Sequence, residues 1–270
     1  MTTCRRYTDR VVVVTGGTTG IGLATVRRLH DEGAAVVFCG RRPDVGDEVA
    51  GAFGSARAVF VAADVTVRSD LEALYATTID RFGRLDAVVN NAGNVVVGPT
   101  MGLRPDDWRR TMALNLDAVF DSCQLAIGHL RRTIASGSAS GAAIVNVASL
   151  DSVGADRGFA AYNAAKAGVV NFTRALALEF GPEGIRANAV SPGAIETPLT
   201  TLTTRDPRAR AAFEAAIPLR RYGQPDEIAA AIAFLAADEA GFVNGANLLV
   251  DGGVTAGTGH PDVMDLFGMG

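Results

Sequence analysis

The sequence predicts an α/β fold, a single doubly wound domain in which a seven-stranded parallel sheet carries helices on both faces. Short β-branched runs alternate with longer helix-like stretches along the chain, and parallel strands with helical crossovers require this order. The first run passes directly into a glycine-rich turn and a helical pattern. With 270 residues, of which 48% are hydrophobic, the chain is long enough to bury one large core, so we expect one domain over residues 1–270.

The strands and helices can be placed in order along the chain. The expected strands are seven short runs bounded by turn residues, at 11–15, 35–39, 58–62, 87–90, 143–147, 187–190 and 247–250. The helices between them are expected to begin at positions that suit a helix N-terminus, several of them with proline. These positions are near Ile21, Pro43, Val67, Pro105, Phe159, Pro198 and Pro225. Residues 135–141 are expected to form a flexible loop, and the tail 254–270 either lacks a fixed structure or packs against a neighbouring subunit.

The composition argues against several classes of function. Charged residues make up 20% of the chain and the net charge is −4, so no basic face for nucleic acid is expected. No apolar run approaches the ~18 residues of a membrane span, and the first residues lack the apolar region of a signal peptide. We therefore expect no membrane partner and a cytoplasmic location. The 3 cysteines and 3 histidines are scattered, which predicts neither a disulfide framework nor a metal site.

The glycine-rich turn suggests a phosphate site. The sequence Thr15-Gly16-Gly17-Thr18-Thr19-Gly20-Ile21-Gly22 joins the first strand to the first helix. Glycines let the backbone approach a pyrophosphate, which the free N–H groups at the helix start attract. This context is typical of the Rossmann-type dinucleotide-binding fold and predicts phosphate contacts from Gly16, Thr18, Thr19, Gly20, Ile21 and Gly22. A tight strand-to-helix turn without a ligand is the alternative.

The end of the second strand indicates which dinucleotide is bound. A site for NAD(H) usually has a carboxylate there, which binds the ribose 2′-hydroxyl. Here Gly40 takes that place, followed by Arg41 and Arg42. A guanidinium can bind a 2′-phosphate through two hydrogen bonds, so NADP(H) is favoured while NAD(H) stays possible. Alternatively, both arginines are solvated at the sheet edge.

A tyrosine and a lysine form the candidate acid/base pair. Lys166 is the only lysine among the 25 lysines and arginines, and it follows Tyr162 by four residues. Residues i and i+4 share a helix face, so the ammonium would lie close enough to stabilise a phenolate. We therefore expect the pKa of Tyr162 to be lowered from its usual ~10. An unrelated pair on an exposed helix is the alternative.

Together with further motifs, these features resemble the short-chain dehydrogenase/reductase family over about residues 10–253. The glycine-rich turn matches the family's Thr-Gly-x-x-x-Gly-x-Gly loop, and the other motifs follow in the family's order. They are Asp64 and Val65 for the adenine ring; Asn91, Ala92 and Gly93 after the fourth strand; Asn115, Ser149, Tyr162 and Lys166 as the catalytic tetrad; and Pro192, Gly193, Ile195 and Thr197 beside the nicotinamide.

The resemblance implies an oxidoreductase that transfers a hydride between NADP(H) and a ketone or secondary alcohol. Tyr162 would be the general acid/base, and Lys166 would hold its pKa down and bind the nicotinamide ribose. Ser149 would donate to the substrate oxygen, and Thr197 would bind the carboxamide. Asn115 would anchor a water in a proton relay to Lys166, unless it is a structural asparagine.

The candidate substrate residues are Val95, Leu150, Asp151, Phe159 and Leu199. The family often has a small residue after the catalytic serine and a serine at position 165, but here Leu150 and Asp151 follow Ser149 and alanine occupies position 165. Asp151 would favour a polar or hydroxylated substrate, whereas the apolar residues fit a cyclic or medium-chain ketone. Leu199 belongs to the segment 194–218, which we expect to form a mobile lid.

The same sequence is compatible with other functions, and it predicts an oligomer. A 3-oxoacyl-thioester reductase would use Arg131 and Arg132 to bind an acidic acyl carrier protein, although cations also suit a plain helix end. An NAD-dependent alcohol dehydrogenase and a non-catalytic NADP(H)-binding regulator are compatible with the same fold. We expect a homotetramer or homodimer through the helices around 106–134 and 160–180, whose apolar residues include Ala164, Ala167, Val170, Phe172 and Leu176.

Overall fold

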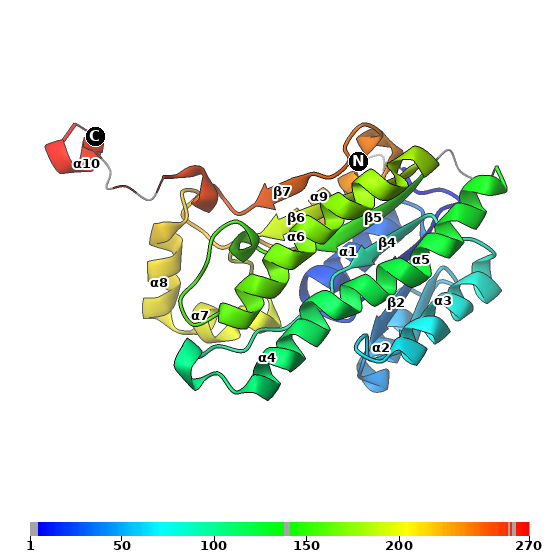
Figure 1. The fold of residues 1–270 in the computed structure, drawn as a ribbon, viewed down its shortest axis with the longest axis horizontal. Coiled ribbons are helices and arrows are strands. Elements are labelled where there is room, and N and C mark those ends of the chain that lie inside the picture. Colours follow the sequence, from blue (N-terminus) through cyan, green and yellow to red (C-terminus); the bar gives the residue numbers. More distant parts are fainter. Residues whose placement is uncertain (1–4, 138–140, 259, 261–262, 270) are drawn as a thin grey trace.

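A parallel sheet of seven strands forms the centre of the computed structural model, which describes residues 5–137, 141–258, 260 and 263–269 (Figure 1). The strands are β1 (Val11–Val14), β2 (Ala35–Gly40), β3 (Ala58–Ala62), β4 (Ala87–Asn90), β5 (Ala142–Val147), β6 (Ile185–Pro192) and β7 (Asn247–Val250). They lie in the order β3-β2-β1-β4-β5-β6-β7, and neighbouring strands run parallel. The predicted sheet is therefore confirmed.

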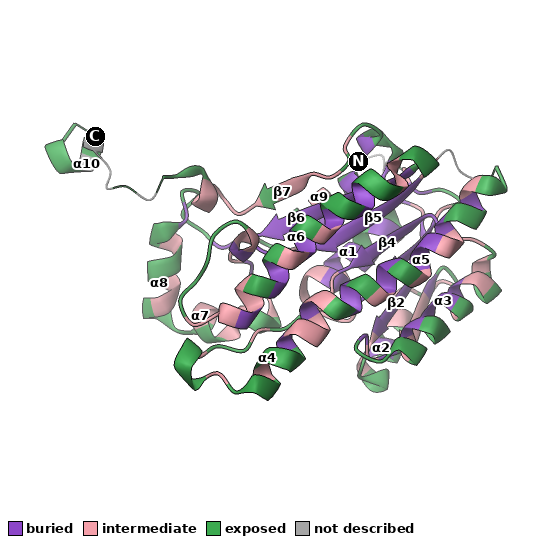
Figure 2. Cartoon of the chain, in the orientation of Figure 1, coloured by how far each residue is buried: buried purple, intermediate pink, exposed green. Residues whose placement is uncertain are grey.

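Helices cover both faces of the sheet. On one face lie α3 (Arg68–Phe82), α5 (Ala118–Ala135) and α6 (Ala160–Phe180), and on the other lie α1 (Gly20–Asp31), α2 (Pro43–Ala52) and α9 (Pro225–Ala236). Strand side chains alternate between the two layers, so that Val13 belongs to the first core and Val12 and Val14 to the second. Figure 2 shows the result, with buried strands between helices whose outer faces are exposed.

Three segments contain helical structure that the sequence analysis did not specify. The helix expected around 106–134 is divided into α4 (Pro105–Met112) and α5 by a π-helical segment, Ala113–Asp117. The expected lid contains α7 (Thr201–Arg205) and α8 (Pro207–Ala216), and no residue of α8 is buried. In the tail, α10 (Val263–Phe267) lies apart from the sheet in Figure 1. Residues 138–140 of the expected loop lie outside the described residues.

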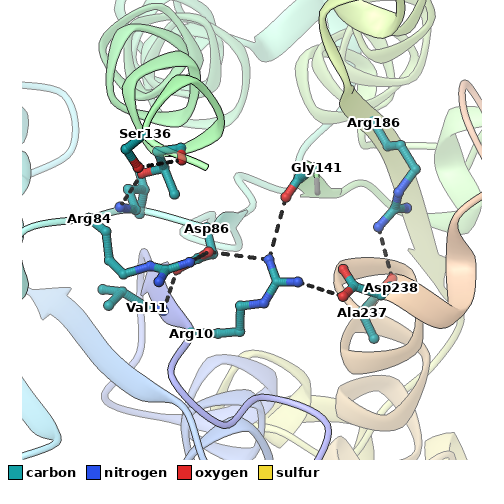
Figure 3. A network of polar contacts seen from close by, with 11 residues as sticks. Arg10, Val11, Arg84, Asp86, Ser136, Gly141, Arg186, Ala237 and Asp238 are labelled. Atoms are coloured by element: carbon teal, nitrogen blue, oxygen red, sulfur yellow. Dashed lines mark hydrogen bonds and ion pairs between the residues drawn. The ribbon is translucent and has the colours of Figure 1, made fainter. Parts of the chain in front are cut away.

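A polar network ties the amino ends of the strands together (Figure 3). The buried carboxylate of Asp86 accepts the N–H of Val11 at 2.8 Å and forms ion pairs with Arg10 and Arg84. A buried carboxylate has to be paired in this way, so the network stabilises the amino ends of the strands, opposite the loops that follow the strands.

None of the helices in the described part of the chain combines the length and hydropathy of a membrane-spanning segment.

Candidate active site

A cavity of about 560 Å³ lies at the carboxyl ends of the strands, between the loops that follow β1 to β6. β1 and β4 are neighbours in the sheet although β2 and β3 separate them in sequence. The loops after β1 and β4 therefore diverge and leave a crevice, where doubly wound sheets bind their ligands. Every cofactor-binding residue predicted above lines this cavity, as do Ser149 and Leu199.

The turn after β1 is closely packed at Gly16 and Gly22, where a side chain would not fit. Gly16 has a φ of +66°, and a Cβ there would lie 2.9 Å from the Cα of Ala92. A Cβ on Gly22 would lie 2.1 Å from the carbonyl oxygen of Gly16. Asn91 steadies the turn, because its Nδ2 donates to the carbonyl oxygens of Thr15 at 3.0 Å and of Gly16 at 3.2 Å. The turn and the start of α1 together fit a pyrophosphate.

Replacement of Gly22 with alanine is expected to weaken NADPH binding at least about tenfold, or ~1.4 kcal/mol. The added methyl group overlaps the Gly16 carbonyl, so the phosphate turn has to move. Calorimetric titration with NADPH measures the loss. Gly51→Ala on α2 is the matched control, since nothing lies within 4 Å of a Cβ there. Unchanged affinity in the Gly22→Ala variant would show that the phosphates do not meet this turn.

The far end of the cavity carries the two arginines that follow β2. Arg41 and Arg42 are exposed, and neither guanidinium donates a hydrogen bond to another described residue. Burial acts to raise the pKa of Asp64, but hydrogen bonds from Thr66 and the charge of Arg41 leave it below its usual value. Position 40 has no space for a side chain, because a Cβ there would lie 2.9 Å from Cγ2 of Thr18. A carboxylate at this position, as is usual in an NAD site, would have to displace the side chain of Thr18.

Tyr162 and Lys166 lie on the first turns of α6 and line the cavity together. The Nζ atom of Lys166 lies 5.6 Å from the centre of the Tyr162 ring and donates to the carbonyl oxygen of Val147 at 2.8 Å. Lys166 is only 3% exposed, and burial lowers the pKa of its ammonium to about 8. The cation is thus largely buried and has no ion-pair partner among the described residues.

The predicted lowering of the Tyr162 pKa is wrong for the protein without a ligand. Burial raises the pKa of this phenol to about 12, the charge of Asp151 adds to the rise, and a hydrogen bond with Ser149 offsets part of it. The sequence argument considered only the charge of Lys166, whereas removal of the phenol from water disfavours the phenolate more strongly. The phenol is therefore protonated at neutral pH.

Asn115 is buried in the π-helical segment between α4 and α5. Its Nδ2 donates to the carbonyl oxygens of Thr111 at 3.0 Å and Asn94 at 2.9 Å, and its Oδ1 accepts the N–H of Asn94 at 3.3 Å. A Cβ added to Gly93 would lie 2.9 Å from this Oδ1 and 3.5 Å from the Nζ of Lys166. The side chains of Asn115 and Lys166 therefore both border the small space beside Gly93.

Ser149 follows β5 and caps the short 3-10 turn Leu150–Ser152. Its Oγ accepts the backbone N–H of Asp151 at 3.2 Å and donates to the carboxylate of Asp151 at 3.1 Å. The serine also lies close enough to Tyr162 to lower the pKa of the phenol. Three of the four predicted catalytic residues, Ser149, Tyr162 and Lys166, thus share one end of the cavity, with Asn115 behind Lys166.

Most of the candidate substrate residues do not line the cavity. Leu199 lines the cavity, but Val95, Leu150, Asp151 and Phe159 do not. The ring of Phe159 lies 6.4 Å from that of Tyr162, and Asp151 reaches the site through Ser149.

The sequence argument missed Asn94, whose backbone holds Asn115, although it directly follows the motif that ends at Gly93. It also missed Thr200, whose Oγ1 accepts the N–H of Thr197 at 3.0 Å, and no signal in the sequence pointed to it.

Known proteins resemble the chain over most of its length. A family model described as enoyl-(acyl carrier protein) reductase matches residues 16–255. Meso-2,3-butanediol dehydrogenase of Serratia marcescens is 39% identical, over 96% of this chain and 100% of that protein. NADP-dependent (R)-specific alcohol dehydrogenase of Lentilactobacillus kefiri is 35% identical, over 93% and 98%. A crystal structure from Agrobacterium tumefaciens, described as a gluconate dehydrogenase, superposes with a TM-score of 0.87 at 33% identity, and covers 94% of this chain and 99% of its own.

Proposed function

We propose that this chain, which belongs to the short-chain dehydrogenase/reductase family, transfers a hydride between NADP(H) and a ketone or secondary alcohol. The relatives named above are dehydrogenases that act on CH–OH groups. The observation that carries the proposal is the pair of Tyr162 and the buried, sole lysine beside a cavity that fits a dinucleotide. It is tested by the change in NADPH absorbance with a panel of ketones, and of secondary alcohols in the reverse direction. No turnover with any of them would contradict it.

The residues of the chain can carry out the proton side of this reaction. The nicotinamide supplies or accepts the hydride. Tyr162, protonated at neutral pH, donates its proton to the carbonyl oxygen, and in alcohol oxidation the phenolate takes the proton back. Lys166 offsets the negative charge that the tyrosine then carries, and its lowered pKa allows it to exchange a proton with a water that Asn115 would anchor. Ser149 donates to the same substrate oxygen.

Cofactor preference gives a direct prediction. We expect NADPH to bind at least tenfold more tightly than NADH, roughly 1.4 kcal/mol, because the free guanidinium groups of Arg41 and Arg42 can bind the 2′-phosphate. Arg41→Ala should remove most of that difference in titrations with both cofactors. Arg27→Ala is the matched control, an exposed arginine on α1 that does not line the cavity. Equal affinities in the unmodified protein would show that both arginines are merely solvated.

The acyl-carrier alternative has one observation for it and one against it. The description of the matching family model names an acyl carrier protein. The guanidinium of Arg131, however, is paired with Glu183 and lies 5.2 Å from the ring centre of Phe180, while Arg132 contacts His129. These charges are engaged within the chain, which makes them poor contacts for an acidic partner. A 3-oxoacyl thioester in the same panel of substrates compares the two functions.

We also propose a homotetramer or homodimer, on narrower grounds than the sequence offered. Val170 and Leu176 are buried in the core of the chain itself. Of the other residues named from the sequence, Ala164 and Ala167 are exposed on α6. The outer layer also carries Leu178, which is 81% exposed, Phe120, which is 47% exposed and packs against Phe172 at 5.9 Å between ring centres, and Trp108, which is 40% exposed. Light scattering at micromolar concentration is expected to show more than one chain per particle, and a monomer would contradict this.

A further inference from the structure

The hydroxyl group of Ser149 is engaged by a carboxylate two residues further along the chain. Ser149 Oγ donates to Oδ2 of Asp151 at 3.1 Å, and the backbone N–H of Asp151 donates to the same Oγ at 3.2 Å. Both side chains are nearly removed from solvent, since Ser149 is 8% and Asp151 is 6% exposed. The serine hydroxyl is therefore turned toward Asp151.

This contact matters because a serine hydroxyl has only one proton to donate. While that proton lies on the bond to Asp151, Ser149 cannot donate to the substrate oxygen. We propose that Asp151 is a positioning residue whose own protonation decides whether the Ser149 hydroxyl is available to the substrate oxygen. The inference rests on the proposed function, because it assigns a control to the serine of that site.

The surroundings of Asp151 make both protonation states accessible. Burial raises the pKa of this carboxyl group and the charge of Asp156 adds to the rise, whereas Ser149 and the N–H of Asp156 act in the opposite direction. Its other oxygen, Oδ1, is buried and has no hydrogen-bond partner in the described part of the chain. The titratable groups that act on it are Tyr162 on α6 and Asp156 in its own loop, while β6 contributes the neutral Ser191, which bonds to the neighbouring Ser152.

The two states have opposite effects on Ser149. An ionised Asp151 only accepts, and so it holds the serine proton. A protonated Asp151 can donate to Ser149 Oγ instead, and the serine proton is then free to stabilise the negative charge that develops on the substrate oxygen. Ketone reduction is therefore faster when the pH falls through the pKa of Asp151.

The kinetic test compares Asp151→Asn and Asp151→Ala with the parent in ketone reduction with NADPH, from about pH 5 to about pH 9. Neither variant can ionise at this position, so the ratio of variant kcat to parent kcat is expected to rise with pH and to reach about tenfold at the alkaline end. KM should change little, because the serine bond strengthens in the transition state. A ratio that stays constant with pH would overturn the inference.

Asp156→Asn is the matched control for the loss of a charge. It removes an exposed carboxylate near Asp151 and keeps Asp151 itself. Its kcat should fall with rising pH as in the parent, with the midpoint moved to lower pH because a neighbouring negative charge is gone. Loss of the pH dependence in this variant would contradict the assignment to Asp151.

A stability measurement separates failure of this inference from failure of the proposed function, because it needs no substrate. The folded-state pKa of Asp151 is raised, so the ionised group destabilises the folded chain above that pKa. Asp151→Asn is therefore expected to raise Tm at neutral pH, and the gain should shrink as the pH falls. The gain should be larger by about 2–4 °C in a Ser149→Ala background, where the carboxylate has lost its donor. Additive effects would overturn the inference even in an active enzyme, whereas coupled effects in a protein that reduces no ketone would refute only the proposed function.

Discussion

Tyr162→Phe is expected to lower kcat for ketone reduction by about 10²–10⁴-fold, the range that a positioned acid/base contributes. The substitution keeps the ring that packs 6.4 Å from Phe159 and 5.6 Å from the ammonium of Lys166, and it removes only the hydroxyl group. NADPH affinity should therefore change little. The loss is measured by steady-state turnover at saturating NADPH, with calorimetry for the cofactor.

The pH dependence follows from the pKa of Tyr162, which burial raises to about 12. Reduction needs the protonated phenol, so the ionisation of Tyr162 does not add to the fall in rate that we assign to Asp151. Alcohol oxidation needs the phenolate and increases with pH. Tyr222→Phe is the matched control, since the hydroxyl of Tyr222 is buried without a partner in the described part of the chain and its removal should leave kcat unchanged. A Tyr162→Phe enzyme with normal turnover in both directions would remove Tyr162 from the mechanism.

Lys166→Arg is expected to lower kcat at least ~100-fold. A guanidinium is larger than an ammonium and permanently charged, so it can neither keep the contact with Val147 in the same space nor give up a proton. Turnover and the pH–rate profile measure the effect. Arg174→Lys, on the exposed face of the same helix, is the matched control and should be silent. Near-normal turnover of the Lys166→Arg enzyme with an unchanged pH profile would refute the Tyr-Lys assignment.

Lys166→Met separates catalysis from stability at the same position. The folded-state pKa of Lys166 is about 8 against an ordinary value of 10.5, so the charged lysine destabilises the fold below about pH 8, and this cost fades as the pH rises toward 10.5. Lys166→Met should therefore inactivate the enzyme and yet raise Tm at neutral pH, with a gain that shrinks in alkali. A lower Tm at neutral pH would mean that the ammonium is better solvated than its burial indicates.

The sheet could be predicted closely because its signals are local. Six of the seven expected helix starts lie within one residue of the observed ones, since proline and the glycine turn act on the backbone where they stand. The seventh, Pro198, begins a 3-10 turn, and α7 follows at Thr201. Strand β6 was underestimated at 187–190 because Ile185 and Pro192, at its ends, pair with neighbours that sequence alone does not reveal. The cofactor side of the cavity followed from the same motifs.

The remaining features depend on contacts between distant segments. The π-helical segment around Asn115 depends on hydrogen bonds to Asn94, which belongs to the loop after β4. The pKa of Tyr162 depends on burial, which a pair read from one helix does not contain. Four of the five candidate substrate residues do not line the cavity, because the side chains that do so come from loops whose paths the sequence does not specify.

The tight contact between position 40 and Thr18 makes the order of mutations matter in evolution. A Cβ at position 40 would lie 2.9 Å from Cγ2 and 3.0 Å from Oγ1 of Thr18, so an acidic residue there requires the threonine side chain to move. A Thr18→Gly substitution made first would open the space, but it would weaken the turn that binds the phosphates. Under the proposed NADP(H) preference, we therefore expect the effect of an acidic residue at position 40 to depend on the residue at position 18, so that the two positions are epistatic.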